Sequence, residues 1–94
     1  MTEKGLPEGA EKYRETKEFT EVTVPKGLLA DHNTAAGVWG LLVIVEGSLD
    51  YTRTGKLPVE VTRDAPAVIY PQEPHHITCD RPVRFRVEFY RIRS

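Results

Sequence analysis

Three histidines and one cysteine are the side chains of this chain best suited to metal binding or acid–base chemistry. Imidazole is the commonest protein ligand for transition metals and changes its charge close to neutral pH. His75 and His76 are adjacent, so in an extended strand their rings point to opposite faces. Cys79 shares the face of His75 but lies four residues further on, about 13 Å along a strand, which is too far for both to bind one ion. The third histidine is His32, and the fold decides which of the three meet.

Other catalytic classes find no support in the sequence. Ser48 falls in a predicted turn and Ser94 is the last residue, and neither lies in the Gly-x-Ser-x-Gly motif of serine hydrolases. Gly55-Lys56 lacks the preceding glycine loop of a phosphate-binding P-loop. For Cys79 two interpretations stay open, a reactive thiol and burial as a small apolar side chain. Burial is favoured because free cysteine is among the most buried residue types.

Length and charge limit the class of protein. The 94 residues suffice for one domain, and 13 Lys and Arg against 14 Asp and Glu give a net charge of −1. That balance argues against a protein that mainly coats nucleic acid or anionic membrane. No apolar run approaches the roughly 20 residues that cross a bilayer, and the single cysteine forms no internal disulfide. We therefore expect a cytoplasmic protein with no membrane and no nucleic-acid partner.

Alternation of apolar and polar residues sets in at Phe19 and continues to the end of the chain, interrupted by Gly, Pro and Asp clusters. The predicted strands are residues 19–24, 28–34, 38–46, 49–53, 59–62, 67–70, 75–79 and 83–92, with Gly47-Ser48 as a tight turn. Short strands at this spacing are typical of an all-β sandwich or barrel. Residues 1–18 carry few apolar side chains and are predicted to be a flexible or extended arm, which leaves 19–94 as the domain.

Residues 38–46 are apolar on both faces of the predicted strand. Trp39, Leu41 and Val43 share one face, and Leu42 and Ile44 lie on the other. If one face lines the core, the second needs its own cover, because large apolar surfaces are seldom left in water. A homodimer interface supplies that cover in one interpretation, and packing against the N-terminal arm supplies it in the other.

Two stretches resemble the conserved motifs of cupins. Residues 64–75 resemble the second motif, in which a turn leads through prolines to an inward histidine, and residues 27–47 resemble the first, with His32 and a closing Glu-Gly turn. Further phrases resemble the small cupin family related to the accessory domain of tellurite-resistance protein B: Phe19-Thr20, Val24-Pro25-Lys26-Gly27-Leu28-Leu29, His32-Asn33-Thr34, Gly37-Val38-Trp39-Gly40, Glu46-Gly47 and Val87-Glu88-Phe89-Tyr90. The resemblance covers most of the chain, from Phe19 to Tyr90.

The resemblance implies a cupin double-stranded β-helix, a jelly-roll barrel in a single domain that is often dimeric. The family's activity is poorly defined. Methyl transfer is not implied, because in tellurite-resistance proteins it belongs to a separate methyltransferase domain, for which this chain leaves no room. A role in a stress response such as tellurite resistance rests on this analogy alone.

The same resemblance implies a depleted metal site. Of the usual cupin ligands only His32 and His75 are present, because Thr34 replaces the second histidine and Gly40 the glutamate. Catalytic zinc normally has three protein ligands, so a divalent Zn, Fe, Mn or Ni ion would need further ligands from neighbours such as Asp31, Glu46 or Glu73.

The expected function is therefore binding of a divalent metal or a small molecule at the barrel mouth. His32 and His75 are the candidate metal ligands, and Thr34, Tyr70 and Glu73 are the candidate ligand-binding residues. Two alternatives remain open: a metal-dependent enzyme that acts on a small polar substrate, and a non-catalytic accessory subunit.

Overall fold

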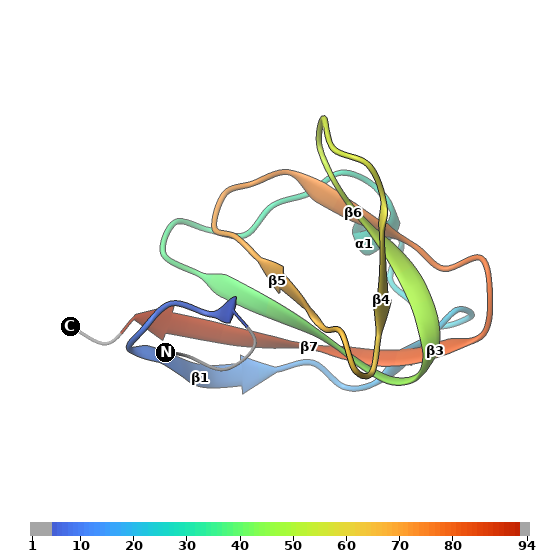
Figure 1. The fold of residues 1–94 in the computed structure, drawn as a ribbon, viewed down its shortest axis with the longest axis horizontal. Coiled ribbons are helices and arrows are strands. Elements are labelled where there is room, and N and C mark those ends of the chain that lie inside the picture. Colours follow the sequence, from blue (N-terminus) through green and yellow to red (C-terminus); the bar gives the residue numbers. More distant parts are fainter. Residues whose placement is uncertain (1–4, 93–94) are drawn as a thin grey trace.

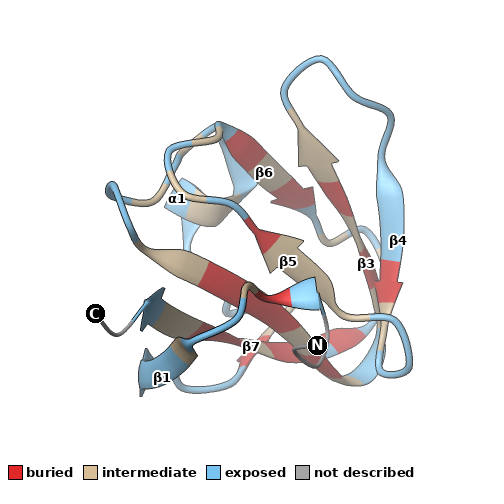
Figure 2. Ribbon diagram, turned by 60° about the vertical axis from the view of Figure 1, so that its left-hand side comes forward, coloured by how far each residue is buried: buried red, intermediate tan, exposed pale blue. Residues whose placement is uncertain are grey.

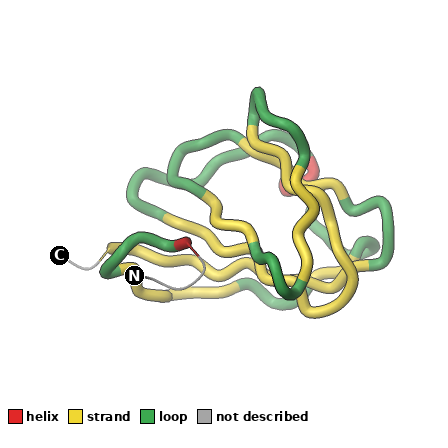
Figure 3. The backbone as a smooth tube through the Cα atoms, viewed as in Figure 1, coloured by secondary structure: helices red, strands yellow, loops and turns green. Residues whose placement is uncertain are grey.

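Seven strands and one short helix make up residues 5–92, the part of the chain that the computed structural model describes (Figure 1). In chain order they are β1 (Ala10–Glu15), β2 (Phe19–Thr20), α1 (Lys26–Leu29), β3 (Trp39–Arg53), β4 (Val59–Thr62), β5 (Ala67–Ile69), β6 (His75–Thr78) and β7 (Val83–Ile92). All the ladders between these strands are antiparallel. The predicted all-β class and the single small domain are confirmed, and Figure 3 shows how little of the chain is helical.

Strand β3 belongs to two groups of strands. Its first part, up to Gly47, pairs with β7 on one side and with β5 on the other. Its second part, from Ser48 to Arg53, lies between β4 and β6. Strands β1 and β2 follow one another along the outer edge of β7. Figure 1 shows β3 running beside β7 and then turning away from it to lie beside β4.

The turn predicted at Gly47-Ser48 is a bend within this one strand. The β3–β7 register shifts between Ile44 and Glu46, and Gly47 adopts a φ of 75°. A bulge followed by a residue in the left-handed region bends a strand sharply without ending it. Because the Gly-Ser pair satisfies the pattern of a turn as well as that of a bend, the sequence predicts two strands where the structure has one.

One further prediction is not confirmed, and another differs from the structure. The closed jelly-roll barrel is not established, because the strand order β1-β7-β3-β4 is open and no ladder among residues 5–92 joins β4 to β1. Residues 28–34 are not a strand: they contain the end of α1 and one isolated β-bridge, between His32 and His75. This segment therefore has little regular backbone hydrogen bonding: α1 has four residues, and a single bridge to β6 follows it.

The core lies between the facing sides of the two groups of strands. Figure 2 shows buried residues concentrated on β3, β6 and β7, whereas β1, α1 and the β3–β4 connection are largely exposed. The core cluster consists of Phe19, Leu42, Ile44, Leu49, Tyr51, Val61, Ile69, Ile77, Val83, Phe85 and Val87. Phe85, predicted on the core face of its strand, is fully buried. Full burial of such a side chain contributes about 1.5–3 kcal/mol to stability.

The second apolar face of β3 is covered within the chain near its N-terminal residues. Leu41 has no exposed surface and Leu6 is also buried, although both lie outside the main core cluster. Residues 10–15, assigned from sequence to the arm, form β1 and pair with β7. The buried Leu6 and the closeness of Gly5 to the side chain of Val68, the β5 partner of Leu41, favour packing against the N-terminal segment as the cover for Leu41. Residues 1–4 of the predicted arm lie outside the described residues.

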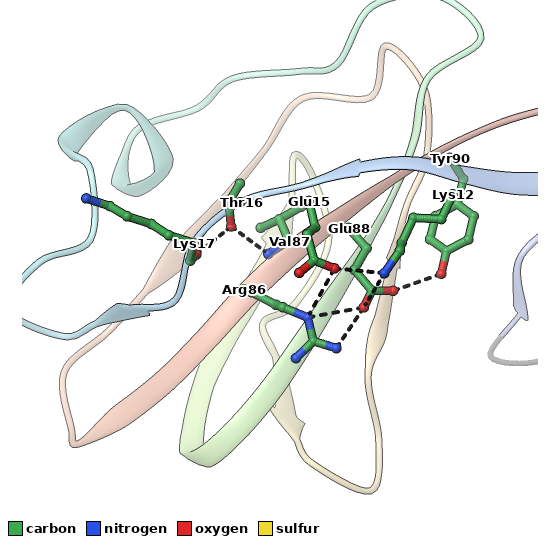
Figure 4. A network of polar contacts seen from close by, with 8 residues as sticks. All are labelled: Lys12, Glu15, Thr16, Lys17, Arg86, Val87, Glu88 and Tyr90. Carbon is green, nitrogen blue, oxygen red and sulfur yellow. Dashed lines mark hydrogen bonds and ion pairs between the residues drawn. The ribbon is translucent and has the colours of Figure 1, made fainter.

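A polar network covers the outer side of β1 and β7 (Figure 4). Glu88 is 5% exposed although it is charged. Its carboxylate accepts hydrogen bonds from Arg86 Nη2 and Tyr90 Oη, each at 2.8 Å, and lies 3.8 Å from Lys12 Nζ. These partners compensate for the desolvation of the carboxylate. None of the helical segments within residues 5–92 has the length and apolar character needed to span a membrane.

Candidate functional site

His32 and His75 form a reciprocal backbone pair at the start of β6. The amide of His32 donates to the carbonyl of His75 at 2.9 Å, and the amide of His75 donates to the carbonyl of His32 at 2.8 Å. On its other side His75 pairs with Arg53 of β3. The two predicted histidines are 43 positions apart in the sequence, and this bridge along β6 brings them together.

The two rings are held in the same way. Nδ1 of His32 lies 2.9 Å from the carbonyl oxygen of Ala30, and Nδ1 of His75 lies 2.8 Å from that of Glu73. A carbonyl oxygen only accepts, so both Nδ1 atoms carry the proton and donate it. In a neutral imidazole the other nitrogen, Nε2, then keeps a free lone pair. Histidines that bind metals are usually oriented by this kind of Nδ1 hydrogen bond.

The rings lie edge to face, with their centroids 4.3 Å apart and their planes inclined by 67°. His75 is 2% exposed, whereas His32 is partly exposed. Burial lowers the pKa of His75, and the nearby His32 acts in the same direction, although the hydrogen bond to Glu73 opposes them. At pH 7 the ring of His75 is therefore neutral and its Nε2 acts as an acceptor.

A cavity of about 340 Å³ opens beside the two rings. Its lining residues are Tyr13, Arg14, Thr16, Leu28, His32, Asn33, Thr34, Ala35, Val38, Ile69, His75, Val87 and Phe89. The Cζ atom of Arg14 lies 5.3 Å from the centre of the Phe89 ring. Apolar walls with a few convergent polar groups are the usual composition of a small-molecule site. Tyr13, Arg14 and Thr16 come from the predicted arm, which is why the sequence did not suggest them.

The predicted ligand residues separate into two groups. Thr34 lines the cavity with the histidines, but its hydroxyl donates to the carbonyl of Val38 at 2.8 Å. Glu73 contributes its backbone carbonyl to the ring of His75, while its side chain is directed to Arg53, with Oε1 and Nε 3.6 Å apart. Tyr70 lines a different cavity.

The carboxylates expected to complete a metal site are engaged elsewhere. Asp31 Oδ1 lies 2.8 Å from Nδ1 of His76, and Glu46 pairs with Arg84 at 2.6 Å. Within residues 5–92 no group of three or more His, Cys, Asp or Glu side chains is arranged to hold a metal ion. Within the described part of the chain, the neighbouring rings of His32 and His75 are thus the candidate ligands, without a third His, Cys, Asp or Glu beside them.

The two remaining candidates from the sequence have ordinary surroundings. His76 lies on the opposite face of β6 from His75, as the alternation of a strand requires, and is bound to Asp31. Cys79 is partly buried and packs against the core, and burial raises the pKa of its thiol. A thiol of this kind remains protonated and weakly nucleophilic at pH 7.

Tyr51 and Arg53 were not among the residues selected from the sequence. They share the inward face of β3 with Leu49, and the ring of Tyr51 lies 5.5 Å from that of His75 between centroids. The alternation Leu49-Tyr51-Arg53 was visible in the sequence and could have placed both on the side of the histidines. What it could not show was that His75 pairs directly with Arg53 across the ladder.

The model of the TehB-like domain family matches residues 14–87, whereas no match was found among curated proteins. A crystal structure of a protein from E. coli strain K12 is similar, with a TM-score of 0.84 at 19% identity over 95% of this chain and 97% of that one. TehB from Haemophilus influenzae is similar with a TM-score of 0.83 at 20% identity over 90% of this chain.

The structural matches show a shared fold, because their identities are too low to carry more. This chain spans 32% of the length of TehB, about a third of that protein. The family match is more informative, since it covers most of the residues in β1 to β7, His32, His75 and all the lining residues of the two cavities except Tyr13 and Phe89. The relation to TehB predicted from the sequence motifs is thereby confirmed, and the chain belongs to the TehB-like domain family.

Proposed function

We propose that this protein is a cupin-like binding domain that holds a small molecule in the cavity beside His32 and His75. The observation that carries the proposal is the matched pair of imidazoles, each fixed through Nδ1 to a backbone carbonyl, so that Nε2 is the ring nitrogen that remains for a ligand. Two acceptors at an apolar cavity favour a ligand that presents N–H or O–H donors on an otherwise apolar body.

A divalent metal ion is part of this proposal, in a limited form. Two neutral imidazoles fit two coordination positions of Zn, Fe, Mn or Ni, and their Nδ1 hydrogen bonds are the outer contacts that such ligands use. With Thr34 and Gly40 at the other cupin ligand positions, the remaining coordination positions fall to water or to the bound molecule. Such an ion is held more weakly than one with three protein ligands.

Metal binding is tested on untagged protein dialysed against Zn²⁺ or Ni²⁺ and analysed for metal content. The informative variants are His32→Asn and His75→Asn, because asparagine keeps a donor near the Nδ1 position and removes Nε2. We expect the wild type to bind one ion per chain and both variants to lose it. His76→Asn is the matched control, since its ring lies on the opposite face and it should bind as the wild type does.

Two outcomes contradict the metal part of the proposal: a wild type that binds no ion, and a His76→Asn variant that loses the ion with the others. The small-molecule part has a separate test in amide NMR spectra during a ligand screen. Binding in this cavity should shift the amides of Asn33, Thr34 and Ala35, which line it. Ligands that shift only other residues count against the site.

We also propose a homodimer, because the resemblance to cupins implies one. Because Leu42 and Ile44 belong to the core, the face left for an interface is that of Leu41. Leu41 is already buried within the chain, so a dimer would use other residues of that face, such as the partly exposed Trp39 and Val43. Light scattering decides this directly, because the chain has a mass of 10.7 kDa and a dimer has twice that. A cytoplasmic location completes the proposal and is tested by fractionating cells that produce the protein.

A further inference from the structure

A second cavity, of about 320 Å³, lies at the β3–β4 hairpin and shares no lining residue with the cavity of the histidines. Its lining residues are Tyr51, Arg53, Lys56, Leu57, Val59, Ala67, Val68 and Tyr70. They combine a buried hydroxyl, two cations and an exposed apolar rim. Each of these three features needs an explanation that the fold alone does not supply.

The hydroxyl of Tyr51 is buried without a partner. Tyr51 is 4% exposed, and its Oη has no hydrogen bond among the described residues. Native proteins pair nearly all of their buried polar atoms, so each exception calls for a reason. Burial raises the pKa of Tyr51 to about 12, helped by the nearby charge of Glu73. The phenol is therefore protonated at pH 7, and its O–H, which is shielded from solvent, is an unused donor on a residue that lines the cavity.

Two cations stand at the same cavity. The Nε of Arg53 lies 3.6 Å from Oε1 of Glu73, an ion pair without a hydrogen bond, and the Cζ of Arg53 lies 5.6 Å from the centre of the Tyr70 ring. The ion pair occupies the Nε side and leaves the other guanidinium nitrogens for a further acceptor. Lys56 makes no ion pair with a described residue. With Glu73 included, the three groups carry one net positive charge, enough for a monoanion.

The rim of the cavity is apolar and exposed to water. Leu57 is 84% exposed, Val59 58% and Tyr70 43%. These are three of the large apolar side chains that the protein leaves in solvent, and all three line this one cavity. Exposed apolar residues gathered around a polar centre are characteristic of binding sites.

We propose that this cavity is a second binding site, separate from that of the histidines, and that it takes a small organic carboxylate with an apolar body. The carboxylate accepts hydrogen bonds from the hydroxyl of Tyr51 and from the guanidinium of Arg53, and Lys56 adds charge. Planar carboxylates match the fork of an arginine better than other anions of this size. The apolar body of the ligand covers Leu57, Val59 and Tyr70.

Phenylacetate is a suitable probe, titrated into the ¹⁵N-labelled protein and followed by amide NMR. We expect saturable shifts at Lys56, Leu57 and Tyr70, with an affinity in the millimolar range or tighter for a ligand of this size. Two compounds with the same phenyl body serve as controls: 2-phenylethanol, which is neutral, and phenethylamine, which is a cation. Both should bind at least about tenfold more weakly, because they lose the charge-assisted hydrogen bonds.

Three variants locate the carboxylate. Arg53→Gln and Tyr51→Phe should each weaken phenylacetate binding roughly tenfold or more, since each removes a hydrogen bond to a charged group. Arg63→Gln is the matched control for the change in charge: Arg63 is exposed, lines neither cavity and should leave the affinity unchanged. The NMR spectrum of each variant shows whether it is folded.

The proposal is overturned if phenylacetate does not saturate, if 2-phenylethanol binds equally well, or if Tyr51→Phe binds as tightly as the wild type. Shifts confined to Asn33 and Ala35 would assign the ligand to the histidine cavity and also overturn it. Because the two cavities report on different amides, failure here is distinguishable from failure of the proposed histidine site.

Discussion

The rings of Tyr51 and His75 pack against each other with centroids 5.5 Å apart and planes inclined by 49°, and each lines a different cavity. One pair of buried side chains therefore separates the histidine cavity from the cavity at the β3–β4 hairpin. Both residues come from the second group of strands and are adjacent in its ladder, since Tyr51 pairs with Ile77, two positions after His75. Substitution of either residue directly changes the wall of the one cavity that it lines.

Tyr51→Phe should leave the free protein as stable as the wild type or raise its stability by up to about 1–2 kcal/mol, because it removes a buried hydroxyl that has no partner. Tyr90→Phe is the matched comparison, since the hydroxyl of Tyr90 donates to Glu88 at 2.8 Å, and it should lose about 1–2 kcal/mol. Urea unfolding at pH 7 measures both. If Tyr51→Phe is the less stable of the two, a bound water rather than an open site satisfies the hydroxyl.

Glu88→Gln should destabilise the protein by about 2–3 kcal/mol, because it takes the charge out of a buried, fully engaged carboxylate and leaves Arg86 only its longer contact with Glu15, at 3.9 Å. Burial alone would raise the pKa of Glu88, but hydrogen bonds from Tyr90 and Arg86 outweigh it and lower the pKa. In the control, Glu18→Gln, an exposed carboxylate 4.0 Å from Arg84 is changed. Its effect should stay within about 0.5 kcal/mol in the same urea experiment. Equal losses in the two variants would contradict the importance assigned to the network.

Gly47→Ala should be far more damaging than Gly55→Ala, although both glycines have a positive φ, of 75° and 82°. A Cβ at Gly47 would collide with the carbonyl oxygen of Pro82, whereas a Cβ at Gly55 meets no atom within 4 Å. Gly55→Ala should therefore cost about 1–2 kcal/mol for the backbone conformation alone. Gly47→Ala should lose more than about 3 kcal/mol by thermal or urea unfolding. Similar losses in both would show that the bend in β3 can shift to admit a side chain.

Stability should fall as the pH drops below about 6.5, in a range where carboxylates do not yet titrate. Burial lowers the pKa of His75, so between its folded-state pKa and the ordinary value the unfolded chain binds more protons than the folded one. Folding is then penalised on the acidic side of that range. The melting temperature measured from pH 7.5 to pH 5.5 shows the slope. His75→Asn should reduce this pH dependence of the melting temperature, and His76→Asn should not. If the slope is unchanged in His75→Asn, another group causes the pH dependence.

Much of the fold follows from the sequence because strand alternation is a local property. Strand β7 was predicted with its boundaries and its core face, and Phe85 is buried as expected. The bend at Gly47 was mistaken for a turn because the same residue type serves both geometries. Whether the strands close into a barrel depends on pairing between distant edges, which no local pattern specifies.

The site was predicted in part for a similar reason. His32 and His75 were selected through the motif resemblance and do meet, but spacing could not show that Tyr70 and Glu73 turn toward Arg53 instead. Arg14 reaches the cavity because β1 lies on the edge of β7, a pairing between opposite ends of the chain. Strand alternation assigns a face to each residue, whereas the partner across that face depends on register.

The segment from Ala30 to Val38 makes few hydrogen bonds to other segments, and all of those described go to residues 72–76. Its described backbone hydrogen bonds to other segments run to Gln72 and His75, and its side-chain bond runs from Asp31 to His76. It can therefore open as a unit while every named strand keeps its ladder, at a free energy well below that of global unfolding. Hydrogen exchange at the amide of His32 would then be faster than at those of β3 and β7. In the proposed function a ligand would reach buried His75 through such an opening, and its entry rate would then follow a local fluctuation instead of the overall stability.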